Sequence, residues 1–272
     1  MGQKMSNAPI YFALAQVRFN AILALDQYLP AIQDNLRKAG FPDFEKAFLG
    51  VINLAVGGGV PSQGSPIPAI QPMQPQARYT FSNEARTSGF VLDQSMMLFQ
   101  TTAYDVFKAF SDDFLKGIAA VNDAATLSYS ERIGVRCLDA ICPRDGESLD
   151  QYLVASVKGI YDQLAPRELV HSWSETRTKE GNTTLVSRTI ITRHDREESV
   201  AFPPELQPMQ LKVSDKFSKI KGLYGIVDTD SWLEEREKFD LSGIEKRLDA
   251  LHKKLRRSFN LMATSYALKV WK

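Results

Sequence analysis

The sequence predicts an α+β fold in which two β-α-β4-α repeats share one antiparallel sheet, with the helices on one face of that sheet. Three observations support this prediction: a five-residue phrase occurs twice, alternating apolar residues precede each copy, and helical periodicity follows each copy. Alternation is typical of a half-buried strand, and apolar spacings of three and four are typical of an amphipathic helix.

The repeated phrase is Leu-Asp-Gln-Tyr-Leu, which occupies residues 25–29 and again residues 149–153. The copies lie nearly half the chain apart, and the order of the predicted elements around them agrees. We therefore interpret the chain as an internal duplication, with a first repeat over residues 1–125 and a second over 126–272. The alternative is that two unrelated amphipathic helices share five residues by chance.

In the first repeat, a strand with apolar odd positions is followed by a helix, about four further strands and a second helix. The predicted ranges are a strand at 11–19, a helix at 23–38, a strand at 48–56, three strands between 78 and 101, and a helix at about 106–118. Residues 57–76 hold four glycines and five prolines, which predicts a long surface loop. Its three consecutive glycines lack the Gly-Lys-Ser/Thr helix start of a nucleotide-binding loop.

The second repeat shows the same order of periodic segments. The predicted ranges are a strand at 131–141, a helix at 147–164, strands at 168–177, 183–193, 209–213 and 223–227, and a final helix that starts with Asp240 as N-cap and continues to about 269. A helix of that length would measure roughly 45 Å. We therefore expect its end to pack on a second copy of the chain.

Composition narrows the classes of function. The chain has 272 residues with 33 basic and 32 acidic side chains, so its formal charge of +1 predicts no general affinity for nucleic acid. No signal-peptide pattern or membrane-spanning run is found, and we expect a cytoplasmic protein without a membrane partner. Cys137 and Cys142 are expected to be reduced, and the three histidines have no ligand spacing. We therefore expect no metal and no cofactor.

Strand parity identifies a candidate binding surface. The valine before each repeated arginine should face the helices, so Arg18 and Arg136 should face the other side of the sheet, together with Phe12 and Leu14. A mixed apolar and arginine surface on an uncovered sheet indicates a partner. We predict a non-enzymatic binding or sensor component that contacts a protein partner or a second copy of itself. Nucleic acid on the same face is the alternative.

A catalytic constellation is not evident. The exception is Asp228-Thr229-Asp230, expected at a strand end, where paired carboxylates could hold Mg²⁺ for phosphoryl or nucleotidyl transfer. That chemistry also needs a phosphate-binding turn and a third carboxylate, and neither is found nearby. The simpler interpretation is that Asp228 and Asp230 end the strand and cap the next segment. A Mg²⁺-dependent enzyme using Asp228 and Asp230 is thus a further alternative.

The phrases Asn-Ala-Pro-Ile at residues 7–10 and Gln-Val-Arg-Phe at 16–19, with Asp-Thr-Asp at 228–230, resemble a sporadically distributed, uncharacterised family of prokaryotic proteins. The family implies no activity, although its patchy distribution implies mobile or defence-associated genes. Separately, the element order resembles the duplicated TATA-binding-protein-like architecture. That resemblance implies a curved sheet that can receive nucleic acid, with Phe or Leu wedges and arginines at phosphates.

Overall fold

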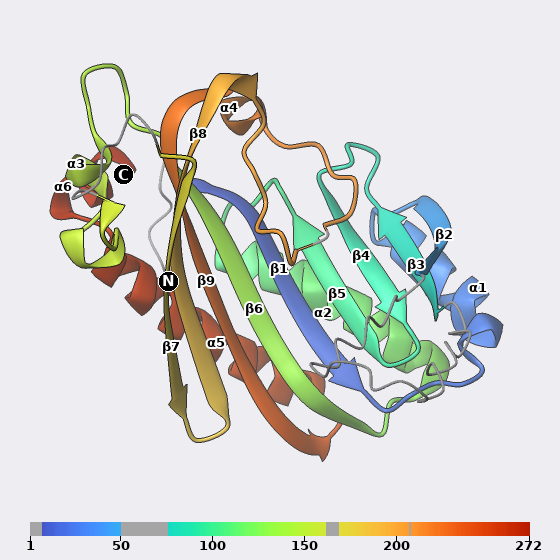
Figure 1. Ribbon diagram of the computed structural model, residues 1–272. Helices are drawn as coiled ribbons and strands as arrows, with labels where there is room; N and C mark the ends of the chain where they lie inside the picture. The colour runs from blue at the N-terminus through green and yellow to red at the C-terminus, as the bar shows by residue number, and fades with distance from the viewer. Residues whose placement is uncertain (1–6, 50–75, 162–168, 207) are drawn as a thin grey trace, which may run out of the picture.

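The computed structural model describes residues 7–49, 76–161, 169–206 and 208–272. Within these residues, nine strands form one antiparallel sheet in the order β2-β3-β4-β5-β1-β6-β9-β8-β7 (Figure 1). The strands are β1 (Ile10–Phe19), β2 (Asp43–Leu49), β3 (Gln76–Ser82), β4 (Ser88–Asp93), β5 (Met96–Thr101), β6 (Tyr129–Ile141), β7 (His171–Glu180), β8 (Thr183–Glu198) and β9 (Ile220–Lys238). The predicted α+β class with one antiparallel sheet is confirmed.

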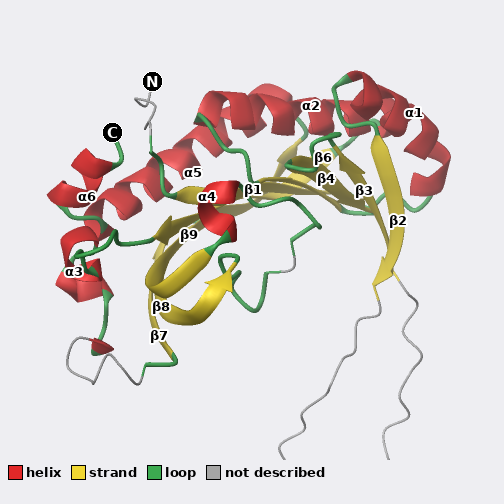
Figure 2. Cartoon of the chain, turned by 90° about the horizontal axis from the view of Figure 1, so that it is seen from above, coloured by secondary structure: helices red, strands yellow, loops and turns green. Residues whose placement is uncertain are grey.

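Three long helices cover one face of the sheet: α1 (Leu25–Lys38), α2 (Phe107–Ala125) and α5 (Leu241–Met262). They run in a row along one side, and β7 and β8 curl away from them, so the opposite face of the sheet is concave (Figure 2). The short helices α3 (Leu149–Tyr152) and α6 (Ser265–Val270) lie together at one end, with the 3-10 turn η1 (Ala155–Val157) after α3. The single turn α4 (Asp215–Ser218) precedes β9.

The strands on the two sides of the central β1–β6 pair follow the same order. Moving outward, β1 is followed by β5, β4 and β3, and β6 is followed by β9, β8 and β7. Each half thus places its first strand at the centre and its later strands in reverse order, and β2 adds an extra edge strand to the first half. This topology is compatible with a duplication, which stays a prediction.

The main hydrophobic core lies between the sheet and the three long helices. Val17 and Val135 are 0% and 1% exposed and belong to this core, as their strand parity predicts. Aromatic residues of β3, β4 and β5 fill the space under α1 and α2, notably Phe81, Phe90 and Phe99. The first half therefore has an apolar floor on which two helices pack.

The second half departs from the predicted helices. The helix expected over 147–164 ends after one turn, and Leu153 is extended and forms an isolated bridge with Ala263. Asp240 caps α5 as predicted, but α5 ends at Met262 and the chain turns into α6. Tyr152 of α3 packs on Trp271 with ring centroids 5.9 Å apart. The chain therefore covers this end of α5 itself, and the expected packing on a second copy stays a prediction.

Strand boundaries also differ. β9 extends through Lys238, so Asp228 and Asp230 lie inside a strand and not at its end. The predicted strand at 209–213 is irregular. The described strand β2 covers only the start of the predicted 48–56 strand and begins earlier; the remainder, and all of the 57–76 loop except Gln76, lie outside the described residues. In the described part of the chain, no helix is long and apolar enough to cross a membrane.

The packing of α2 on β4 gives a first prediction. A Cβ added at Gly117 would lie 2.2 Å from the Phe90 ring, which is fully buried. Gly117→Ala should lower the free energy of unfolding by about 1–3 kcal/mol, because overpacking outweighs the helix propensity gained from alanine. Urea denaturation measures the change, and Phe90→Leu in the same background should restore part of it. The exposed neighbour Lys116→Ala is the control, and an unchanged or raised stability of Gly117→Ala would contradict the packing.

Candidate functional site on the concave face

The structure places the four predicted contact residues on the concave face, as their parity requires, but it covers three of them. Phe12, Leu14 and Arg136 are 0%, 8% and 7% exposed, whereas Arg18 is exposed. The expectation of an uncovered sheet is therefore wrong for these three residues. Residues 199–206 and 208–219, here called the cover segment, connect β8 to β9 across this face (Figure 1).

The cover segment is held by apolar packing. Phe202 packs edge-on against Phe12, with ring centroids 5.2 Å apart, and it also packs against Tyr11. The other apolar residues that pack in this cluster come from both sides of the contact: Leu14, Leu138, Ile190, Val200, Leu206, Val213, Phe217, Ile220 and Tyr224. A second hydrophobic core thus forms on the concave face at the end of the sheet near Phe12.

Hydrogen bonds fix the cover segment at several points. The Tyr11 hydroxyl donates to the Ala201 carbonyl oxygen over 2.8 Å. The Met209 N–H donates to Gln100 Oε1 over 2.8 Å, and Thr102 Oγ1 donates to the Lys212 carbonyl oxygen over 2.6 Å. The Ala201 N–H also donates to the Tyr224 hydroxyl of β9 over 3.2 Å. Because these contacts reach both halves of the sheet, the cover segment is an integral layer of the fold.

A buried ion cluster joins the cover segment to the sheet. Arg136 donates from Nε and Nη2 to the two carboxylate oxygens of Asp228 over 2.8 and 2.7 Å, and Arg188 Nη1 donates to the same carboxylate over 3.0 Å. Glu205 of the cover segment accepts from both arginines over 2.7 and 2.8 Å. Burial lowers the pKa of Arg136, but its hydrogen bonds to Asp228 and Glu205 and the charge of Asp228 outweigh this effect and raise the pKa above its ordinary value.

This cluster gives Asp228 a structural role. Its side chain is 0% exposed and its two oxygens accept from two guanidinium groups, which compensate the burial of its charge. Asp230 lies two residues further on the same face, where burial raises the pKa of its carboxyl group to about 6. Among the described residues, no group of three metal-ligating side chains is found. The arrangement supports ion pairing at Asp228 better than coordination of Mg²⁺.

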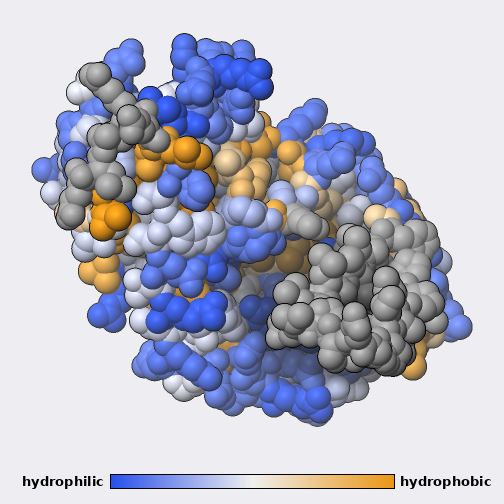
Figure 3. All heavy atoms as spheres, in the orientation of Figure 1, coloured by the Kyte–Doolittle hydropathy of each residue, from blue (hydrophilic) through white to orange (hydrophobic). Residues whose placement is uncertain are grey.

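The concave face beyond the cover segment carries a different set of residues, here called the arginine–tryptophan patch: Gln16, Arg18, Arg132, Arg177 and Trp232. The guanidinium carbons of Arg132 and Arg177 lie 5.1 and 5.7 Å from the Trp232 ring centroid. Such cation–π contacts hold the indole and the guanidinium groups together. In the space-filling view, most of the described surface here is hydrophilic, and hydrophobic atoms gather toward the upper centre (Figure 3).

Two arginines face each other at the centre of the arginine–tryptophan patch. Arg18 and Arg132 are direct partners across the β1–β6 pair, so two like charges stand opposite each other on one face. Arg132 has Glu234 at 3.9 Å and donates to Gln16 over 3.2 Å, but its buried Nε has no hydrogen-bond partner among the described residues. Arg18 forms no ion pair with any residue of the described ranges. Facing like charges are destabilising unless an anion lies between or beside them.

Sequence reasoning identified Arg18 but missed three residues of the patch. Arg132 could have been found, since it lies four residues before Arg136 on the same strand and therefore faces the same way. Trp232 and Arg177 could not have been found from the sequence. Their positions on this face depend on the full length of β9 and on how β8 pairs with β9 and with β7.

No model of a known protein family matches the chain, and no curated protein is significantly similar to it. The resemblances drawn from the sequence therefore stay predictions, and the function is inferred from the geometry of the site.

The ion cluster predicts a large and specific loss of stability. Arg136→Met leaves the buried Asp228 carboxylate with Arg188 alone, and we expect the free energy of unfolding to fall by about 3 kcal/mol. Asp228→Asn in the Arg136→Met background should recover part of that loss, because it removes the uncompensated charge. The surface pair Arg236–Glu131 is the control, since Arg236→Met removes a solvent-exposed ion pair and should change stability little. Equal small losses in urea denaturation for both variants would contradict the cluster.

Asp139 predicts a pH dependence of stability. Burial, and then the charge of Asp228, raise the pKa of the Asp139 carboxyl group to about 8, so it is protonated in the folded protein at neutral pH. In the unfolded chain it ionises near pH 4. Its stabilising contribution is complete below about pH 4 and is lost as the pH rises toward 8.

Asp139→Asn should therefore gain stability relative to the parent protein between pH 5 and 8, by up to about 1.4 kcal/mol per pH unit. Urea denaturation across this range measures the difference between the two proteins. Asp145→Asn, at an exposed position, is the matched control. A difference between parent and Asp139→Asn that does not vary with pH would show that Asp139 is ionised in the fold.

Proposed function

We propose that this protein is a non-enzymatic binding component that holds an acidic segment of a protein partner on its concave face. The observation that carries the proposal is the facing pair of Arg18 and Arg132 at the centre of the sheet. A carboxylate between these two guanidinium groups would relieve their repulsion and could accept hydrogen bonds from Arg18 and from the guanidinium group of Arg132.

The surroundings of the pair favour a peptide. Trp232, between Arg132 and Arg177, offers an aromatic surface for the apolar part of a segment, and tryptophan and arginine are the residues most enriched in binding hot spots. The concave curvature gives the segment contacts from several strands (Figure 2). The cover segment and its ion cluster keep these strands in place without occupying the patch.

A protein partner is favoured over nucleic acid by the carboxylates near the patch. Glu234 lies 3.9 Å from Arg132, and Glu175 is the partner of Arg188 on the adjoining strands. A continuous phosphate backbone would run alongside these carboxylates and be repelled by them. A short acidic segment can end before it reaches them. The formal charge of +1 for the whole chain agrees with a local contact of this kind.

The test is a quantitative pull-down from the protein's own host with the tagged parent chain and with the double variant Arg18→Glu, Arg177→Glu. Both side chains are exposed, so the variant should fold, and circular dichroism checks this. We expect a protein partner that the double variant captures about tenfold less well, because charge-reversed contacts lose affinity and association rate. Arg256→Glu, on the exposed side of α5, is the matched control and should retain the partner.

Two outcomes would contradict the proposal. One is undiminished capture of the partner by the folded double variant. The other is recovery of nuclease-sensitive nucleic acid whose retention falls steeply as salt rises, which would instead indicate phosphate contacts.

A further inference from the structure

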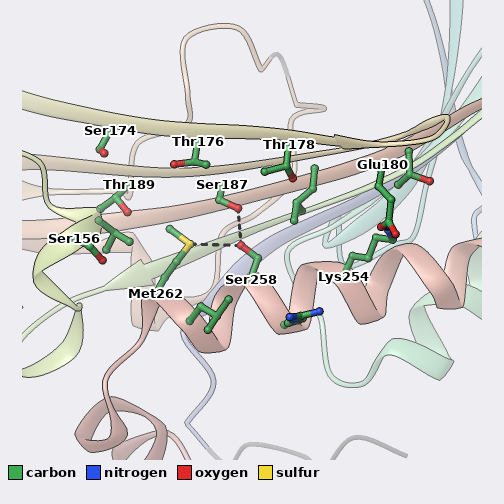
Figure 4. Close-up of a pocket in the computed structure, with 15 residues that line it drawn as sticks. Ser156, Ser174, Thr176, Thr178, Glu180, Ser187, Thr189, Lys254, Ser258 and Met262 are labelled. Atoms are coloured by element: carbon green, nitrogen blue, oxygen red, sulfur yellow. Dashed lines mark hydrogen bonds and ion pairs between the residues drawn. The ribbon is translucent and has the colours of Figure 1, made fainter.

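A cavity lies on the face of the sheet opposite the arginine–tryptophan patch, between the β7–β8 hairpin and α5 (Figure 4). Its volume is about 530 Å³. Sites for small molecules usually measure about 300–1,000 Å³. The cavity is thus large enough for a metabolite, and it is independent of the function proposed above.

The floor of the cavity is a ladder of hydroxyl groups. Eight of its fifteen lining residues are serines or threonines. Ser174 is the cross-strand partner of Thr189, and Thr176 is the partner of Ser187, so neighbouring pairs present hydroxyls side by side. In the first half, β3 and β4 hold the place that β7 and β8 hold in the second. There, the cross-strand pair that faces the helices is Phe81 with Phe90.

This contrast explains why the cavity is open. The aromatic floor of β3 and β4 packs under α1 and α2, whereas the floor of β7 and β8 presents mainly hydroxyl groups, with Leu185 as its apolar residue, and so offers little apolar surface to a second helix. The helix after β6 ends after one turn at Tyr152, and in the described part of the chain the cavity is lined opposite this floor by α5 and by Ser156 and Val157 of η1.

One hydroxyl group indicates that the cavity is built to receive a ligand. Thr189 is 1% exposed, and its Oγ1 has no hydrogen-bond partner among the described residues. In the close-up, Thr189 lies near Ser156 among the residues that line the cavity (Figure 4). Nearby, the Ser187 and Ser258 hydroxyls lie 2.5 Å apart and form a hydrogen bond. Buried polar groups are almost always paired, so the unpaired Thr189 hydroxyl in the cavity lining marks a place where a ligand group could supply the missing hydrogen bond.

The other end of the cavity is cationic. Lys254 and Arg257 extend from α5, and Lys254 is paired with Glu180 of β7. Arg257 is exposed and forms no ion pair with any residue in the described part of the chain. An anionic group of the ligand would therefore find a free guanidinium group beside a lysine.

We propose that this cavity binds a phosphorylated sugar, either free or as part of a nucleotide. The phosphate would bind Arg257 and Lys254, because a guanidinium group matches the geometry of phosphate oxygens. The sugar hydroxyls would pair with the serine and threonine ladder, whose groups both donate and accept, and one of them would satisfy Thr189. Among the described residues that line the cavity there is no aromatic ring, so recognition centres on the sugar and phosphate and not on a stacked base.

Isothermal titration calorimetry with the full chain tests this proposal, using ribose 5-phosphate, adenosine monophosphate, ribose and inorganic phosphate as probes. We expect ribose 5-phosphate or the nucleotide to bind about tenfold or more tightly than either ribose or phosphate alone, since both ends of the cavity contribute. If ribose 5-phosphate binds more tightly than adenosine monophosphate, the ligand is a free sugar phosphate. If adenosine monophosphate binds more tightly, the ligand is a nucleotide. Phosphate that binds as tightly as ribose 5-phosphate, or no binding by any probe at millimolar concentration, would overturn the proposal.

Two variants locate the binding. Arg257→Ala should weaken the binding of the best probe about tenfold, whereas its neighbour Arg256→Ala, which does not line the cavity, should leave binding unchanged. Thr189→Val should weaken it about threefold without lowering thermal stability, because the hydroxyl it removes has no partner in the free protein. Unchanged affinity in both Arg257→Ala and Thr189→Val would place the probe elsewhere and overturn the assignment.

Discussion

The structure depends on one constraint: a nine-stranded sheet has two faces to cover, and the described chain has long helices for only one of them. α1, α2 and α5 bury the convex side, so the concave side must be covered by other means or remain polar. The cover segment buries the end near Phe12, and the Arg136–Asp228–Glu205 cluster ties it to the sheet. Beyond it, arginines and Trp232 replace apolar residues, and this is where we place the partner.

The two halves of the sheet differ in how their helix-facing side is covered. The first half covers its outer strands with two helices over an aromatic floor that includes Phe81 and Phe90. The second half has one long helix over a hydroxyl floor, which leaves a cavity beside α5. β7 serves both surfaces, because alternate residues such as Thr176 and Arg177 face the cavity and the patch. The proposed partner site and the proposed ligand site therefore lie on opposite sides of one hairpin.

The features of the fold that depend on neighbouring residues could be predicted from alternation and helical periodicity. The sheet, the orientation of Val17 and Arg18, the strands between 78 and 101 and the Asp240 cap all follow from neighbours in sequence. The burial of Phe12 and Arg136 could not be predicted, because it depends on an irregular segment some 190 and 70 residues away that carries no periodic signal. The helix expected over 147–164 was also wrong: Leu149, Tyr152 and Leu153 are buried in an apolar cluster as expected, but from one helical turn followed by extended backbone. The patch was found only in part, since Trp232 reaches Arg132 through strand registers.

The central claim is that the concave face, beyond the cover segment, is the contact surface for a partner. Amide hydrogen exchange of the chain, alone and with its captured partner, tests this claim most directly. The account predicts slower exchange in β1 around Arg18, in β6 around Arg132 and in β7 around Arg177, with little change in α1 and α2. Slower exchange confined to the helices of the convex side would contradict it.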